Sequence, residues 1–190
     1  NWSDYKPTTP EFLGTKSFDD YDLAELATHI DWTPFFRTWE LAGAYPAILD
    51  DDVVGEAARR LFEDTKVMLD KIISEKWLTA RAVIGFFPAN AVGDDVELNM
   101  EWEGSNEPKA FHFLRQQMEK REGRANMCLA DFVAPKDTDL TDHIGGFAVT
   151  TGIGIDKKVA EFKAENDDYS EILLKALADR LAEAFAERMH

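Results

Sequence analysis

Apolar residues recur at two spacings along the chain, and these spacings predict where helices and strands lie. Between Asp51 and Trp77 they stand three or four positions apart with charges between them, which predicts a long amphipathic helix. Residues 168–188 repeat Leu173, Leu177, Leu181 and Phe185 every four positions, so a second long helix is expected there. Shorter helices are predicted over 20–29, 34–41, 111–120 and 156–165.

Helix 34–41 has a start signal of its own. Thr33 offers an N-cap hydroxyl, and Pro34 suits the first helical position. The helix is expected to end near Gly43.

The strand signals lie in the middle of the chain. Residues 82–87 are short, apolar and rich in β-branched and aromatic side chains, which predicts a buried strand. Residues 96–102 alternate and are expected to pair with it across a turn at 93–95. Further strands are predicted over 129–134 and 143–151, with a loop at 105–108. The predicted order is helices first, then strands with helices between them, then helices again. This order predicts an α+β domain with a twisted, mostly antiparallel sheet and flanking helices.

The polar residues 1–19, with Pro7 and Pro10, are interpreted as an extended lead-in or linker. Residues 20–190 are long enough for one domain with its own core.

Charge narrows the range of partners. With 37 acidic and 21 basic residues, the formal net charge is −16. A nucleic-acid partner and an anionic membrane surface are therefore not expected, whereas a cationic small molecule or a basic protein patch would fit. No apolar run has the length of a membrane span and no leader pattern begins the sequence, so a cytoplasmic location is expected.

The residues alone indicate no catalytic constellation. The histidines lack metal-ligand spacing, and no nucleotide-binding glycine motif or serine elbow occurs. Cys128 lies in an apolar run and is interpreted as a buried small hydrophobe. The glycines at 145–146, 152 and 154 are interpreted as close-packing or turn residues. On residue types, the chain is an acidic α+β binding module.

One aromatic group admits two interpretations. Trp32, Phe35, Phe36 and Trp39 cluster at helical spacing. Core packing is the simpler interpretation, and a wall for a planar ligand or partner is the alternative.

Six strings then appear in a fixed order: 31–36 with 45–46; 48–49 with 53–55; 85–90 with 92–95; 114–117; 129–136; and 167–169 with 175–185. Through them the chain resembles the N-terminal part of the S-adenosylmethionine-binding reactivation (activation) domain of cobalamin-dependent methionine synthase. The resemblance implies that the chain has the fold of this domain. It also implies that the chain is a module of a methyltransferase and supports reductive remethylation of cobalamin. It implies S-adenosylmethionine as ligand, cobalamin bound by a domain absent from this chain, and a flavodoxin-like electron donor. The cobalamin-binding domain of methionine synthase is the other implied partner.

The resemblance also suggests two ligand-contacting residues and no catalytic residue. Asp31 matches the acid of the Asp-Trp-Thr-Pro motif, and Glu183 matches the acid of Leu-Ala-Glu-Ala-Phe. Carboxylates would attract the ammonium and sulfonium groups of S-adenosylmethionine. Glu183 shares a helix face with Asp179 and Glu187, away from Leu181, so it is free to face a groove. The alternative for each is a plain surface carboxylate, with Asp31 a turn residue ahead of the helix.

One departure from the family concerns the ligand site. The family's Arg-Pro-x-x-Gly-Tyr stretch, which holds much of the ligand, is absent. The isolated chain is therefore expected to be inactive and to bind S-adenosylmethionine weakly or not at all. The alternative function is a shortened, non-catalytic module that docks to a cobalamin-binding protein or another partner.

Overall fold

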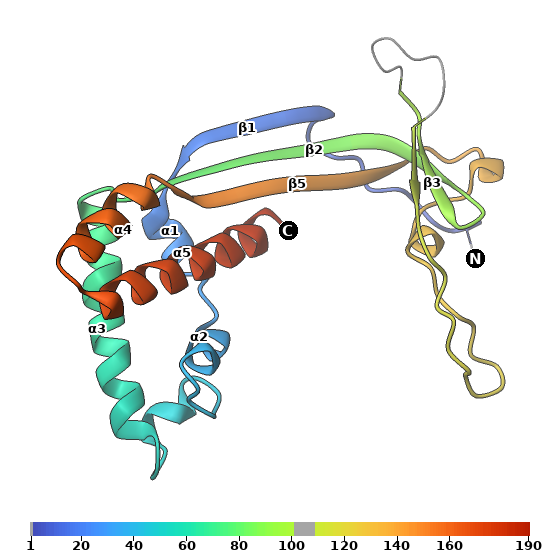
Figure 1. Cartoon of the computed structure of the whole chain (residues 1–190). Helices are drawn as coiled ribbons and strands as arrows, with labels where there is room; N and C mark the ends of the chain where they lie inside the picture. Colours follow the sequence, from blue (N-terminus) through green and yellow to red (C-terminus); the bar gives the residue numbers. More distant parts are fainter. Residues whose placement is uncertain (1, 101–108) are drawn as a thin grey trace. The chain divides into compact units, whose positions relative to one another are not determined.

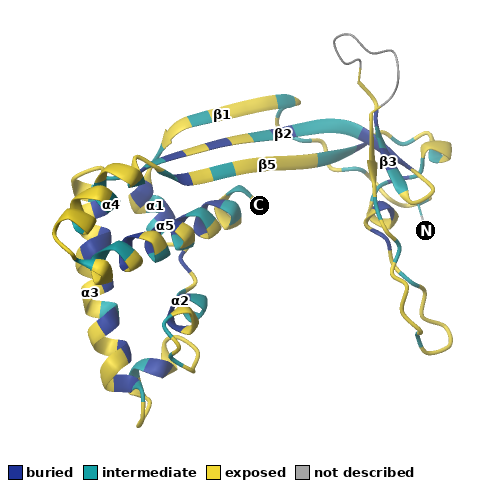
Figure 2. Cartoon of the chain, in the orientation of Figure 1, coloured by how far each residue is buried: buried dark blue, intermediate teal, exposed yellow. Residues whose placement is uncertain are grey.

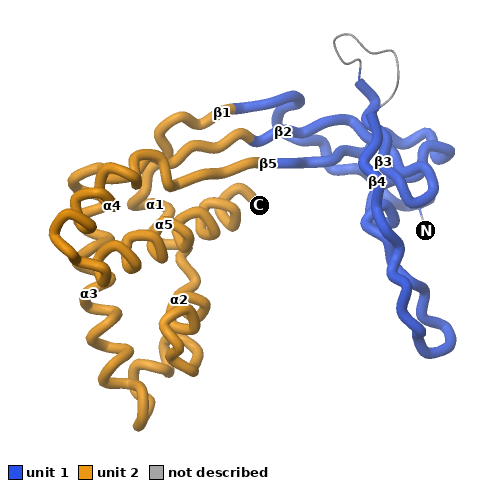
Figure 3. The backbone as a smooth tube through the Cα atoms, viewed as in Figure 1, with its two compact units in different colours: residues 1–16, 84–146 blue, residues 17–83, 147–190 orange. Residues whose placement is uncertain are grey.

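The computed structural model describes residues 2–100 and 109–190. The chain folds into two compact units, one made of residues 1–16 and 84–146 and the other of residues 17–83 and 147–190 (Figure 3). Three strands contribute residues to both units: β1 (Gly14–Tyr21), β2 (Thr79–Val92) and β5 (Asp142–Ile153). We call the two units the hairpin unit and the helical unit, in that order.

The strands form one sheet in the order β1-β2-β3-β4, with β5 also paired to β2 (Figure 1). β3 (Asp95–Leu98) runs antiparallel to β2, and β4 (Ala110–His112) runs antiparallel to β3. Gly93 has φ +64° in the β2–β3 turn, a backbone conformation that glycine adopts without strain. The α+β class and the antiparallel sheet are confirmed. The predicted pairing across this turn is also confirmed, but the residues of β2 that pair with β3 are 89–92, which follow the predicted strand 82–87, and Asp95 belongs to β3.

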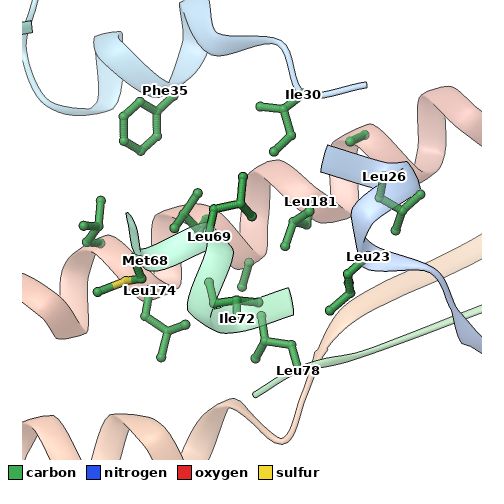
Figure 4. Packing of buried hydrophobic residues seen from close by; sticks show 14 of the residues in the cluster. Leu23, Leu26, Ile30, Phe35, Met68, Leu69, Ile72, Leu78, Leu174 and Leu181 are labelled. Carbon is green, nitrogen blue, oxygen red and sulfur yellow. The ribbon is translucent and has the colours of Figure 1, made fainter. Parts of the chain in front are cut away.

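The helical unit holds most of the described helices: α1 (Leu23–Ala27), α2 (Trp32–Thr38), α3 (Gly55–Ser74), α4 (Ile155–Ala164), α5 (Asp168–Met189) and the 3-10 helix η1 (Ala47–Asp50). The amphipathic patterns that predicted α3 and α5 place their apolar faces in one core, as Figures 2 and 4 show. Asp51 precedes α3 and accepts the N–H groups of Val53 and Val54. These bonds are the first cause of its lowered pKa.

The aromatic group at residues 32–39 is part of this core. The Phe35 and Phe36 side chains are fully buried. Trp32 meets Phe62 of α3 edge-on, with ring centroids 5.0 Å apart. The core-packing interpretation of these aromatic residues is confirmed.

The predicted start of α2 is wrong by two residues. The N-cap is Asp31, whose Oδ1 accepts the Thr33 N–H at 2.9 Å, and the helix begins at Trp32. The Thr33 hydroxyl instead accepts the N–H of Tyr45 at 3.1 Å. A carboxylate two residues upstream caps the helix, which leaves the threonine free to hold the following loop.

The predicted helix over 111–120 is wrong. The chain there forms β4 and then an irregular segment, because Arg115 is held by partners distant in sequence. Its guanidinium donates to Asp94 at 2.6 and 3.0 Å, to both carboxylate oxygens of Asp131, and to the carbonyl of Asn126. These long-range bonds outweigh a weak local helix preference.

The predicted strand over 129–134 is also wrong, since residues Leu129–Phe132 form the 3-10 helix η2. Asp131 closes this turn by accepting the Cys128 N–H at 2.8 Å, which favours a turn over an extended strand. Cys128 itself is 3% exposed, so its prediction as a buried hydrophobe is confirmed. A third 3-10 turn, η3, covers Lys136–Thr138.

Two further differences concern boundaries. Strand β1 begins inside the segment interpreted as a lead-in, and its polar sequence gave no strand signal. β3 ends at Leu98, while residues 101–102 of the predicted strand and the predicted loop at 105–108 lie outside the described residues.

Candidate functional site

Asp31 lies between two buried segments of the helical unit. Ile30 before it is 8% exposed, and Phe35 and Phe36 after it are fully buried, so the backbone at Asp31 is fixed on both sides. Its Oδ1 caps α2, while Oδ2 has no hydrogen-bond partner among the described residues. The Asp31 side chain is exposed and can therefore offer one carboxylate oxygen to a ligand.

Glu183 lies in the last part of α5, next to the buried Ala184 and Phe185. Its side chain is 55% exposed and pairs with Arg180 one turn earlier. The Arg180 side chain is only 14% exposed, and it also contacts Asp179 at 2.6 Å. Arg180 thus holds the Glu183 carboxylate in one orientation and offsets part of its charge.

The two acids flank the same core without touching. Ile30, which precedes Asp31, and Leu181, two residues before Glu183, belong to one group of buried side chains (Figure 4). No hydrogen bond or ion pair joins Asp31 to Glu183 or to a shared partner within residues 2–100 and 109–190. Any ligand between them would supply the contact that joins the two acids.

The end of α5 is tied to α1 by hydrogen bonds. Arg188 Nε donates to Glu25 Oε1 at 2.7 Å, and Tyr21 donates to the same carboxylate oxygen at 3.0 Å. These two hydrogen bonds, with Arg188 the larger cause, lower the pKa of Glu25. The tie fixes the helix that carries Glu183 against the helix that leads to Asp31.

The chemistry available at this place is binding and orientation. Two carboxylates on a rigid core suit a ligand with an ammonium or sulfonium group. Among the described residues, no group of three or more His, Cys, Asp or Glu side chains could hold a metal ion. Within the same residues, no helix has both the length and the apolar character needed to cross a bilayer.

Sequence reasoning missed how these acids are held. Arg180 and Glu183 stand three apart on a predicted helix, and that spacing is a readable signal for an ion pair. Asp31 was recognisable as a possible turn residue, but its role as the cap of α2 was assigned to Thr33 instead.

Comparison with known proteins identifies the family of the chain. The family model described as vitamin B12 dependent methionine synthase, activation domain, matches residues 22–190. A crystal structure of the MetH reactivation domain bound to AdoHcy is similar over 100% of this chain, with 52% sequence identity and a TM-score of 0.91. The chain spans 58% of that solved chain. This chain therefore belongs to the family of vitamin B12-dependent methionine synthase activation domains.

Proposed function

We propose that this chain is an S-adenosylmethionine-binding reactivation module of vitamin B12-dependent methionine synthase, the 5-methyltetrahydrofolate–homocysteine methyltransferase. The observation that carries the proposal is its likeness, at 52% identity, to a reactivation domain bound to AdoHcy. AdoHcy is S-adenosylmethionine without the transferable methyl group, so a site for one presents most of the contacts needed for the other.

In this proposal Asp31 and Glu183 bind the cationic groups of S-adenosylmethionine. Asp31 uses the oxygen that does not cap α2, and Arg180 sets the direction of the Glu183 carboxylate. Cobalamin, when bound by its own domain, would supply the redox and methyl-accepting chemistry. The chain's own residues hold the methyl donor in place, which is catalysis by positioning. The isolated chain is expected to have no methyltransferase activity.

The proposed partners follow from this function. One is the cobalamin-binding domain, and the other is a flavodoxin-like electron donor. The location proposed is the cytoplasm, as the sequence pattern predicts. Fractionation of the source cells, with a membrane-protein marker as control, would test that location.

Titration of the chain with S-adenosylmethionine tests the function. Asp31→Asn removes the charge but keeps a good N-cap residue, and Glu183→Gln removes the other charge. Both changes are expected to weaken binding about tenfold each, the usual scale for a charge-assisted hydrogen bond.

Two matched controls separate binding from folding. Asp22→Asn changes a carboxylate that caps α1 in the same way, by accepting the Ala24 N–H at 2.8 Å. Glu187→Gln changes an exposed carboxylate one turn beyond Glu183. Neither is expected to alter S-adenosylmethionine affinity. Equal affinity in all four variants would contradict the assigned roles, and capture of a cobalamin-binding protein without S-adenosylmethionine binding would favour a docking module.

A further inference from the structure

The hairpin unit contains a cavity far in sequence from both acids of the candidate site. Its volume is about 580 Å³, within the usual range for a small-molecule pocket. Tyr5 and residues 8–12 form one side of it, and the rest comes from β2, η2 and the start of β5. Every lining residue belongs to the hairpin unit.

Aromatic rings make up much of the wall. Phe12 and Phe86 meet edge-on, with ring centroids 5.2 Å apart. Gly145 leaves room for this arrangement, because a Cβ there would lie 2.9 Å from Cε1 of Phe86. Phe132, on η2, adds a ring that is 63% exposed although it lines the cavity. Ring faces of this kind attract flat apolar groups and cations.

The charged residues that line the cavity are both acidic, Glu11 and Asp142. Asp142 is 6% exposed, and its carboxylate accepts from the Tyr5 hydroxyl at 3.5 Å and from the N–H groups of His143 and Ala134, both at 2.9 Å. A carboxylate has about four acceptor positions, so about one is left for another donor. Glu11 is the second acid, and the lining contains no lysine or arginine among the described residues.

His143 lines the cavity next to Asp142 but brings no accessible acceptor to it. Its Nδ1 is buried, with no hydrogen-bond partner among the described residues, and a buried atom is not open to a ligand in the cavity. The imidazole therefore serves this cavity only as part of its wall.

From these features we infer that the cavity of the hairpin unit is a second binding site, for a planar organic cation such as a protonated arylalkylamine. The rings of Phe12, Phe86 and Phe132 enclose the flat body, and the acids attract the positive group. Phosphorylated and carboxylated ligands are disfavoured, because two carboxylates would repel them without a lysine or arginine in the described lining to compensate.

The test uses ligands that share one ring system and differ in charge. Tryptamine is the cation, indole-3-ethanol the neutral analogue and indole-3-acetate the anion. Calorimetric titration at pH 7 is expected to rank them in that order, with tryptamine about tenfold or more tighter than indole-3-acetate. Changing the ligand's charge avoids substituting Asp142, whose hydrogen bonds to the chain support the local fold.

Two protein variants locate the binding. Phe132→Ala removes an exposed ring of the wall and is expected to weaken tryptamine binding about fivefold. Leu114→Ala, at a 95% exposed residue of the same unit outside the lining, is the matched control and should change nothing. Asp31→Asn should also leave tryptamine affinity unchanged, which separates this site from the proposed S-adenosylmethionine site.

His143 gives a readout at the cavity wall, because it is a lining residue. In a two-bond ¹H–¹⁵N NMR spectrum, saturating tryptamine should shift the imidazole resonances of His143, and indole-3-acetate at the same concentration should not. Equal affinity for the three ligands would overturn the inference. So would binding that Phe132→Ala leaves unchanged, unmoved imidazole resonances of His143, or no binding of tryptamine at about 10 mM.

Discussion

Asn90 makes a buried set of polar contacts in the hairpin unit, and replacing it by leucine tests why the sequence has an amide there. Asn90 is 5% exposed. Its Nδ2 donates to the carbonyl of Ala134 at 3.0 Å and to that of Leu140 at 2.7 Å, and its Oδ1 accepts from Asn99 Nδ2 at 2.6 Å. One side chain thus joins β2 to the segment that leads into β5.

The expected cost of Asn90→Leu follows from these bonds. Three hydrogen bonds are lost at about 1 kcal/mol each. The Ala134 carbonyl keeps a second donor, the Ala91 N–H at 3.0 Å, whereas no other described group donates to the Leu140 carbonyl. Burying the leucine side chain, which has the same number of heavy atoms as asparagine, returns about 1 kcal/mol or more. The net loss of unfolding free energy is therefore about 2–4 kcal/mol.

Hydrogen–deuterium exchange with mass spectrometry measures this loss in each unit. Peptides from residues 84–99 and 129–146 should exchange about 30-fold to 1,000-fold faster in Asn90→Leu, and the α5 peptide should be unchanged. Gln117→Leu is the control, because its exposed amide makes a single bond to the Arg115 carbonyl at 2.9 Å. A change below about fivefold in the hairpin-unit peptides would refute the reasoning about this network.

Two other predictions concern the ion-pair network and the helical core. Hydrogen bonds from Arg115, the first cause, and from the Cys128 N–H lower the pKa of Asp131 to about 2. The stability that this adds is present above the unfolded pKa of about 3.9 and is lost as the pH falls toward 2. In Arg115→Met the pKa of Asp131 should rise toward its ordinary value, and an unchanged ¹³C carboxyl titration would contradict this. Phe185→Ala removes a fully buried ring 4.7 Å from that of Tyr21 and should cost about 3–5 kcal/mol in urea unfolding of the helical unit; a loss below about 1 kcal/mol would mean that the core there is not packed as described.

The parts of the fold that follow local periodicity could be predicted from the sequence. Helices α3 and α5 and the β2–β3 hairpin depend on neighbouring residues, and each was predicted close to its observed position. Arg115 shows why other parts of the fold could not be predicted in this way. It bonds to acids 16 and 21 positions away, and such bonds leave no periodic signal in the sequence.

The candidate site also has features that could be predicted from the sequence and features that could not. Asp31 and Glu183 were found through a family motif, since an exposed carboxylate has no pattern of its own. The Arg180–Glu183 pair was readable from helical spacing. The cavity of the hairpin unit was not, because it depends on bringing residues 5–12 against β5.

Titrating isotope-labelled chain with S-adenosylmethionine, followed by ¹H–¹⁵N NMR, tests whether Asp31 and Glu183 form the proposed ligand site. We expect weak, saturable shifts at the start of α2 and in the last two turns of α5, reduced in Asp31→Asn and in Glu183→Gln but not in Asp22→Asn. Shifts elsewhere in the chain, or shifts that both site variants leave intact, would contradict this proposal.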